Sequence, residues 1–342
     1  MSADRSTEAL VPSGWRIVLG VVAAVLLVVG VGILIARAAG FSEVRDAIAA
    51  ANARWFVVCL LGQVVALACY AAVFREAFRW RGGVDPGASL SGHVMLASIG
   101  ATRVLAAGGA GALAATWWCF RRARFSAREA LVRVLGFNTL FYVSFGIGAW
   151  VAAGLTALGI GGEAPVGLTI PWLVLVPACF VAAILATQPK RVAWLTRFDG
   201  SFVRRGLAYA IAGTAWVREV LPDREGRRSV AASSCYWVGN VVCLWAAVSS
   251  VGLALTVPEL VLAFATGHAA MLLPLPLGGV GGVDAAMTYA LTVVGVALAP
   301  ALVAVAVYRL FAFWAPTIPA LVALALLPRA GRALERRALV HT

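Results

Sequence analysis

Charged side chains are scarce in this sequence, and the positive ones are almost all arginine. Only 13% of the 342 residues are Asp, Glu, Lys or Arg, whereas about a quarter of an ordinary soluble domain is charged. Lys190 is the single lysine. The hydrophobic share is 62% and the mean hydropathy is +0.92. This composition excludes a soluble globular domain and predicts an all-α polytopic membrane protein.

Motifs for several kinds of chemistry are also missing. No P-loop pattern is present, and Lys190 lies outside any glycine-rich loop, which argues against ATP hydrolysis by this chain. The cysteines have neither metal-ligand nor Cys-x-x-Cys spacing, so we expect small buried side chains. All six fall in apolar runs: Cys59, Cys69, Cys119, Cys179, Cys235 and Cys243. We therefore predict no metal site, no cofactor and no enzymatic activity.

The formal net charge of +13 comes almost wholly from arginine. In a soluble protein this excess would suggest nucleic acid. In a membrane protein it marks cytoplasmic loops and contact with anionic lipid headgroups. Membrane lipids are therefore the expected partners and nucleic acid is not, while a homo-oligomer or a partner in a cell-envelope complex stays open.

Six apolar runs have about the length that crosses a bilayer. They are residues 17–36, 55–74, 131–155, 170–187, 229–256 and 301–327. We assign 1–15 to an N-terminal tail, 16–328 to a single transmembrane domain and 329–342 to a basic C-terminal tail. The polar region 188–228 within the domain is expected to form membrane-surface helices.

One stretch interrupts the apolar sequence near its C-terminal end. It combines two prolines, four glycines and one carboxylate: Pro274, Pro276, Gly278, Gly279, Gly281, Gly282 and Asp284. Proline and glycine do not hold a helix, and a bilayer offers no water to the backbone groups that this frees. We interpret residues 258–299 as a hairpin broken at a substrate site. A surface loop between two full spans is the alternative.

An earlier glycine-rich break comprises Gly108, Gly109 and Gly111. Only about nine apolar residues follow it before Arg121, and nine helical residues reach only about 13 Å, less than half of the hydrocarbon thickness. This arm cannot cross alone. We therefore predict that residues 87–120 form a re-entrant hairpin that enters and leaves on one side.

The two breaks resemble each other. Residues 108–115 align without gaps on 278–285, with four identities in eight positions. Interrupted hydrophobic segments in corresponding halves indicate the inverted repeat of a transporter, with a site near the midplane. Two unrelated glycine-rich packing turns are the alternative.

Arginine placement predicts the orientation. With the N-terminus inside, the inner segments hold 23 Lys and Arg residues and the outer loops hold three. Positive residues favour the cytoplasmic side. We therefore expect a multi-pass protein of the cytoplasmic (inner) membrane with both termini cytoplasmic.

Three ionisable residues lie inside apolar segments: Arg103, Asp284 and Arg309. Each costs roughly 2.5–3.5 kcal/mol at a helix centre on insertion scales, so each needs a partner or a wet cavity. The arginines could hold an anionic headgroup, since guanidinium binds phosphate in a bidentate way. A structural Asp284–Arg309 pair is the alternative. Tyr308 and Trp314 could cover a headgroup or simply pack.

The pattern from Pro274 through Asp284 to Tyr308-Arg309-Leu resembles the lysylphosphatidylglycerol synthase transmembrane family, whose members are flippase-like and similar to the flippase half of bacterial multiple-peptide-resistance factors. The resemblance covers roughly residues 15–330 and is sharpest over 274–314. Two departures are Asp284, where the family usually has Glu, and the missing proline near Ala106. The resemblance implies a protein that moves or binds lipids.

The leading prediction is therefore translocation or binding of a lipid, either a phospholipid or a polyprenyl-phosphate type. One alternative is a polyprenyl-phosphate-dependent glycosyltransferase, for which Glu43 and Asp46 would be the acidic pair. Another is a non-transporting accessory subunit of a cell-envelope complex.

Overall fold

The chain is described by a computed structural model that covers residues 40–104, 110–162, 164–188, 202–272 and 281–341, together with positions 22, 26, 30, 33 and 37. All regular elements in these residues are helices. Five helical runs among them are long and apolar enough to cross a membrane: Arg54–Gly82, Ala127–Ala157, Val166–Ala186, Arg224–Ser250 and Leu298–Ala325. The prediction of an all-α polytopic membrane protein is confirmed. The sixth predicted span, 17–36, lies mostly outside the described residues.

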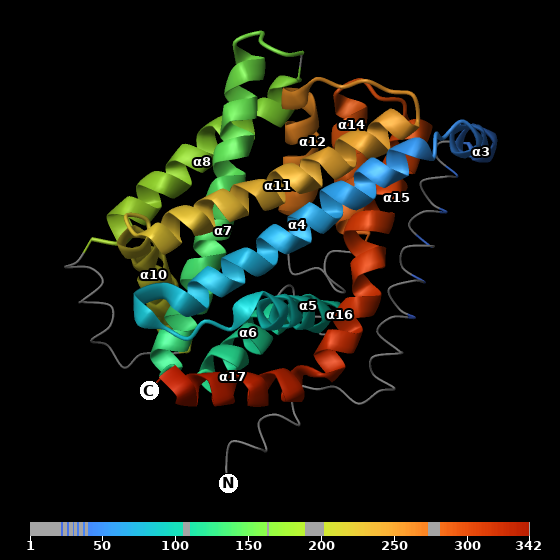
Figure 1. Ribbon diagram of the computed structural model, residues 1–342. Helices are drawn as coiled ribbons and strands as arrows, with labels where there is room; N and C mark the ends of the chain where they lie inside the picture. The colour runs from blue at the N-terminus through green and yellow to red at the C-terminus, as the bar shows by residue number, and fades with distance from the viewer. Residues whose placement is uncertain are drawn as a thin grey trace.

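The helices are shown in Figure 1. In chain order they are α3 (Phe41–Ala49), α4 (Arg54–Arg79), α5 (Gly87–Val104), α6 (Ala110–Arg122), α7 (Ala127–Ala157), α8 (Val166–Ala186), α10 (Phe202–Val220), α11 (Arg224–Ser250), α12 (Val257–Ala269), α14 (Gly282–Val293), α15 (Leu298–Arg309), α16 (Ala315–Ala325) and α17 (Leu327–His341). A π-helical turn, Leu310–Trp314, joins α15 to α16.

Local sequence signals fix several helix ends. Ser126 precedes α7, and its side chain accepts a hydrogen bond from the backbone N–H of Glu129 at 3.2 Å. Thr256 precedes α12, and Glu259 reaches back to accept from the Thr256 backbone N–H at 2.9 Å. Both contacts satisfy backbone donors that an N-terminal helical turn leaves free.

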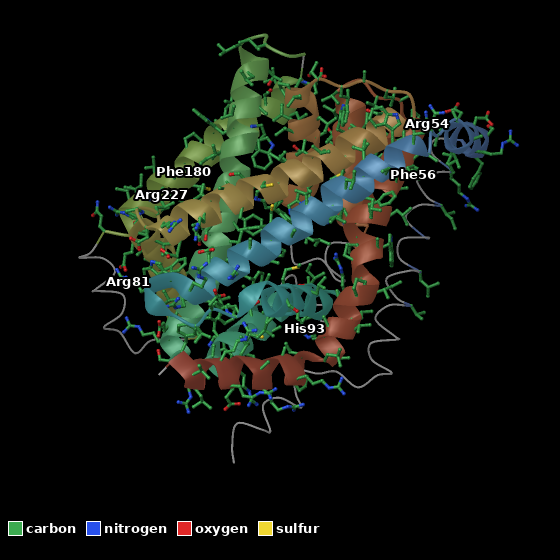
Figure 2. The ribbon with its side chains drawn as sticks, viewed as in Figure 1. Arg54, Phe56, Arg81, His93, Phe180 and Arg227 are labelled. Atoms are coloured by element: carbon green, nitrogen blue, oxygen red, sulfur yellow. The ribbon has the colours of Figure 1, made fainter. Side chains whose placement is uncertain are left out.

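Helices α4 and α11 form the central pair of the bundle. They lie side by side across the front of the view in Figure 1. Figure 2 shows that Arg81, just after α4, and Arg227, near the start of α11, lie on one side of the molecule, whereas Arg54 lies on the other. The two helices are therefore antiparallel. Small residues allow the close approach: a Cβ on Gly239 would lie 2.7 Å from the carbonyl oxygen of Gly62.

Two pairs of shorter helices take the places of the predicted hairpins. Helix α5 packs on α6, and α12 packs on α14. With 13, 13 and 12 residues, α6, α12 and α14 each reach about 20 Å, short of a hydrocarbon core about 30 Å thick. In Figure 1 the first pair lies in the lower half of the bundle and the second in the upper half. That each pair returns to its side of entry stays a prediction.

The order of a long helix, two short helices and another long helix occurs twice. The first set is α4, α5, α6 and α7, and the second is α11, α12, α14 and the continuous α15–α16 run. The packing between the sets is reciprocal, since α5 packs on α16 and α12 packs on α7. Together with the antiparallel α4–α11 pair, this arrangement agrees with the predicted inverted repeat.

The last long helix changes its winding in the middle. Pro316 has no backbone N–H, and its ring crowds the carbonyl group of Ala312, four residues earlier. The helix widens to a π-turn over Leu310–Trp314, directly after Arg309. Such turns occur frequently at functional sites, and this one changes the direction in which the side chains next to Arg309 project.

The close approach of α4 and α11 gives a stability prediction. Gly239→Ala places a methyl group 2.7 Å from the Gly62 carbonyl oxygen, so the helices must separate. We expect a loss of about 1–3 kcal/mol, seen as a lower melting temperature of the detergent-solubilised protein. Gly148→Ala in α7 is the matched control, because its Cβ would meet nothing within 4 Å. Equal melting temperatures for the two variants would contradict the prediction.

Candidate functional site

Residues beside both helix breaks meet at one place in the bundle. Arg103 lies in the last turn of α5, just before 105–109, and Asp284 lies in the first turn of α14, just after 273–280. Arg309 ends α15. The three ionisable residues that the sequence placed inside apolar segments are thus brought together from three helices.

Asp284 and Arg309 form a direct ion pair. The Arg309 Nε atom lies 2.8 Å from Asp284 Oδ1, and the two side chains are 9% and 16% exposed. The other carboxylate oxygen, Oδ2, accepts the backbone N–H of Gly281 at 2.8 Å. Gly281 has φ +80°, a conformation that glycine adopts without strain. The Asp284 carboxylate is therefore held by the start of α14, whose dipole favours a negative charge.

Phe313 brings the second arginine to this pair. The Cζ atom of Arg309 lies 4.2 Å from the centre of the Phe313 ring, and the Cζ atom of Arg103 lies 3.5 Å from the same centre. Both distances are within the range of a cation–π interaction. One aromatic ring therefore holds two guanidinium groups.

Both guanidinium groups keep buried nitrogen atoms without a hydrogen-bond partner. These atoms are Arg103 Nε and Arg309 Nη2, neither of which has an acceptor in the described part of the chain. A buried donor that is left unpaired costs about 1–3 kcal/mol, and more when it is charged. A ligand with oxygen acceptors would remove this cost.

The charges at the site do not balance. Two guanidinium groups lie beside one carboxylate. The Asp284 carboxylate contacts Arg309, while Arg103 contacts the Phe313 ring. Among the described residues at this point the excess is one positive charge. Since like charges repel strongly in a medium of low dielectric constant, an anion is the ligand that this geometry favours.

Neighbouring side chains rigidify the site. The Tyr308 hydroxyl donates to Asn240 Oδ1 at 3.3 Å, and the Asn240 amide donates to the carbonyl oxygen of Tyr236 at 3.0 Å. Tyr308 thereby ties α15 to α11. Trp314 packs against Phe313, with ring centres 5.0 Å apart. From the sequence, Tyr308 and Trp314 could either cover a headgroup or pack. In the structure Tyr308 contacts Asn240 and Trp314 packs on Phe313.

Comparison with protein families identifies the family. A family model described as the lysylphosphatidylglycerol synthase TM region matches residues 18–320. The chain belongs to the lysylphosphatidylglycerol synthase transmembrane family. This confirms the resemblance seen in the sequence. A search of curated proteins gave no match.

Membership of the lysylphosphatidylglycerol synthase transmembrane family gives this chain a lipid-related role in a membrane. The matched region is the family's transmembrane region and is not itself a catalytic domain. Its several apolar helices make the chain a multi-pass membrane protein. The match includes Arg103, Asp284 and Arg309, so the site lies inside the shared region.

Most residues of the two predicted breaks lie outside the described part of the chain. They are Gly108 and Gly109 of the first break and Pro274, Pro276, Gly278 and Gly279 of the second. Gly111 is buried in the first turn of α6. Gly281 and Gly282 begin α14, where the Gly281 N–H holds Asp284.

The acidic pair of the glycosyltransferase alternative lies on another element. Glu43 and Asp46 are exposed on α3, and Asp46 pairs with Arg45 at 3.2 Å. No cluster of three or more metal-binding side chains occurs among the residues that the structure describes.

Sequence reasoning missed Phe313. The signal was present, because Phe313 lies four residues after Arg309, a spacing that places two side chains on one helix face. Arg103 gave no such signal, since its contact with Phe313 joins residues 210 positions apart in the chain.

A double-mutant cycle tests the ion pair of this family member. Asp284→Asn leaves a buried guanidinium without its carboxylate, so we expect the single change to cost about 3–5 kcal/mol of stability. Arg309→Gln should cost a similar amount. The double variant should cost less than the two single changes together, because it leaves no unpaired charge. Thermal unfolding in detergent measures the stability of all four proteins. If the loss of stability in the double variant equals the sum of the two single losses, the ion pair is contradicted.

Proposed function

We propose that this chain binds the anionic headgroup of a membrane lipid between Arg103 and Arg309 and carries it across the membrane. The supporting observation is the pair of buried guanidinium groups with unpartnered nitrogen atoms at the meeting point of two interrupted helix pairs. Substrate sites of transporters with inverted repeats are built in this way.

A phosphate group suits this site chemically. Guanidinium binds phosphate through paired N–H donors, and such charge-assisted hydrogen bonds are among the strong ones. The single excess positive charge matches a phosphodiester, which carries one negative charge. A phospholipid with a diester headgroup presents this chemistry, whereas a polyprenyl phosphate is a phosphate monoester that offers the same oxygen acceptors with up to one more negative charge.

Asp284 has a positioning role in this proposal. It holds Arg309 through Nε at 2.8 Å, and Arg309 Nη2 is left without a partner in the described residues. The Phe313 ring fixes the plane of both guanidinium groups. The donors are therefore arranged before the ligand arrives, which lowers the entropic cost of binding.

Movement of the lipid would follow from the two helix pairs. They approach the site from opposite halves of the bundle (Figure 1), so that rocking one pair and then the other would open the site to one leaflet at a time. The headgroup would cross between them while the acyl chains remain in lipid.

The sidedness of the protein belongs to the same proposal. The segments that hold 23 of the Lys and Arg residues would face the cytoplasm in the inner membrane, with both termini on that side.

Lipid translocation in liposomes tests the proposal. Purified protein is reconstituted with short-chain fluorescent phospholipids, and dithionite quenches the label in the outer leaflet. We expect the wild type to expose inner-leaflet lipid. Arg103→Gln should slow this about 10- to 100-fold, because a charge-assisted hydrogen bond contributes about 1.5–3 kcal/mol.

Arg128→Gln is the matched control, because Arg128 is exposed in the first turn of α7. This variant should transport lipid at the wild-type rate. Melting temperatures and elution profiles of all variants separate loss of function from loss of fold. If Arg103→Gln transports as fast as Arg128→Gln, the headgroup site is wrong. If the wild type moves no labelled lipid with any anionic headgroup, translocation itself is contradicted.

A further inference from the structure

The basic C-terminal segment 329–342 lies largely in a helix, α17, that packs beneath the first helix pair. In Figure 1 it runs crosswise under α5 and α6, and it contacts both. Its buried side chains recur every three or four residues, at Leu327, Ala330, Leu334 and Ala338. The opposite face is basic, and Figure 2 shows nitrogen-tipped side chains along its lower edge. This is the pattern of an amphipathic helix at a membrane surface.

Helix α17 contacts the first helix pair where the pair begins, just before α5, and where it ends, at the last residue of α6. The Arg337 guanidinium donates to the carbonyl oxygens of Asp85 and Pro86, immediately before α5. Near the other end of the pair, Glu335 lies 3.5 Å from Arg122, the last residue of α6. Any force on α17 is therefore transmitted to the first helix pair.

The Asp85 carboxylate does not neutralise the arginines of α17. It binds Arg75 through two contacts of 2.8 Å and also accepts the Gly87 backbone N–H at 2.8 Å. The hydrogen bond from Arg75 lowers the pKa of Asp85 to about 2, so the carboxylate stays ionised and directed at α4. Within the described part of the chain, Arg337 donates to the backbone carbonyls of this loop and pairs with no carboxylate.

A surface cavity of about 350 Å³ opens at this point, lined by Asp85, Arg336, Arg337 and Val340. Arg337 uses one nitrogen, Nη1, for the carbonyls and keeps further donors, since a guanidinium has five N–H groups. Arg336 has no ion-pair partner among the residues that the structure describes, and its side chain is exposed. Among the residues that the structure describes, the two guanidinium groups in the cavity have no ion pair with a carboxylate, since Asp85 binds Arg75.

We propose that Arg336 and Arg337 bind the phosphate of an anionic lipid in the leaflet where α17 lies, and that this lipid clamps α17 onto the first helix pair. The phosphate bridges the two guanidinium groups, while Arg337 keeps its contact with the chain before α5. This site is separate from the Arg103–Arg309 site and does not depend on the proposed function.

The apolar surroundings favour a lipid over a free anion. Val340 lines the cavity and is 85% exposed, and Leu339 beside it is 52% exposed. Exposed aliphatic side chains next to a basic cavity suit the boundary between headgroups and acyl chains, where an amphipathic helix lies.

Thermal unfolding of the purified chain in neutral detergent tests the site. Phosphatidic acid, phosphatidylcholine and inorganic phosphate are titrated separately. Phosphatidic acid should raise the melting temperature of the wild type and the other two should not. Arg336→Gln/Arg337→Gln should weaken the apparent affinity for phosphatidic acid about tenfold or more, because it removes both charge-assisted contacts. Arg329→Gln/Arg332→Gln removes the same charge from the same helix outside the cavity. It should change the apparent affinity for phosphatidic acid less than about threefold.

Hydrogen exchange gives a second readout. Phosphatidic acid should slow exchange at the start of α5 in the wild type and in Arg103→Gln, but not in Arg336→Gln/Arg337→Gln. If both double variants lose the same apparent affinity for phosphatidic acid, the lipid is attracted by the overall charge of α17, and the proposed site is wrong. A response to inorganic phosphate equal to that to phosphatidic acid would overturn the assignment to lipid. Because Arg103→Gln keeps the lipid response, failure of this site and failure of the translocation site are told apart.

Discussion

The buried contact between Asp284 and Arg309 is the constraint on which the rest of the interior depends. A charge in a medium of low dielectric constant must be paired, and its partner must stay in place. This pair joins the start of α14 to the end of α15 at 2.8 Å and thereby fixes these two helices to each other. It also occupies the carboxylate, which leaves Arg103 to the Phe313 ring and gives the site its excess positive charge.

Arginine serves two different purposes in this protein, and its surroundings decide between them. In the interior, Arg103 and Arg309 are held in place by one ring and one carboxylate. Along α17 the arginines are exposed next to aliphatic side chains, an arrangement suited to a membrane surface. The two regions lie at opposite ends of α5, because Arg103 is in its last turn and the Arg337 contacts are with the residues just before its start.

The sequence predicted most of the helices because spans and hairpin arms are set by local properties. A run of apolar residues near 20 can satisfy its backbone only as a helix in lipid, and four predicted spans correspond to α4, α7, α8 and α11 within a few residues. The two predicted breaks fall largely in segments outside the described residues, and proline alone does not end a helix here, since α8 continues through Pro171 and Pro177. The segment 329–342, expected as a basic tail, is helical in α17, and its apolar residues at a spacing of three or four were a signal for this.

The sequence by itself determined the class of the protein, the family, and the identity of three charged residues that membrane burial obliges to find partners. Only the tertiary structure decided which partners they find. Asp284 and Arg309 could have been far apart, and nothing near Arg103 in the chain points to Phe313, because contacts between distant residues depend on how the two helix pairs pack. The same packing turned Tyr308 to Asn240 on α11 and brought Arg103 and Arg309 to the same Phe313 ring, since only side chains brought together from several helices can combine their charges.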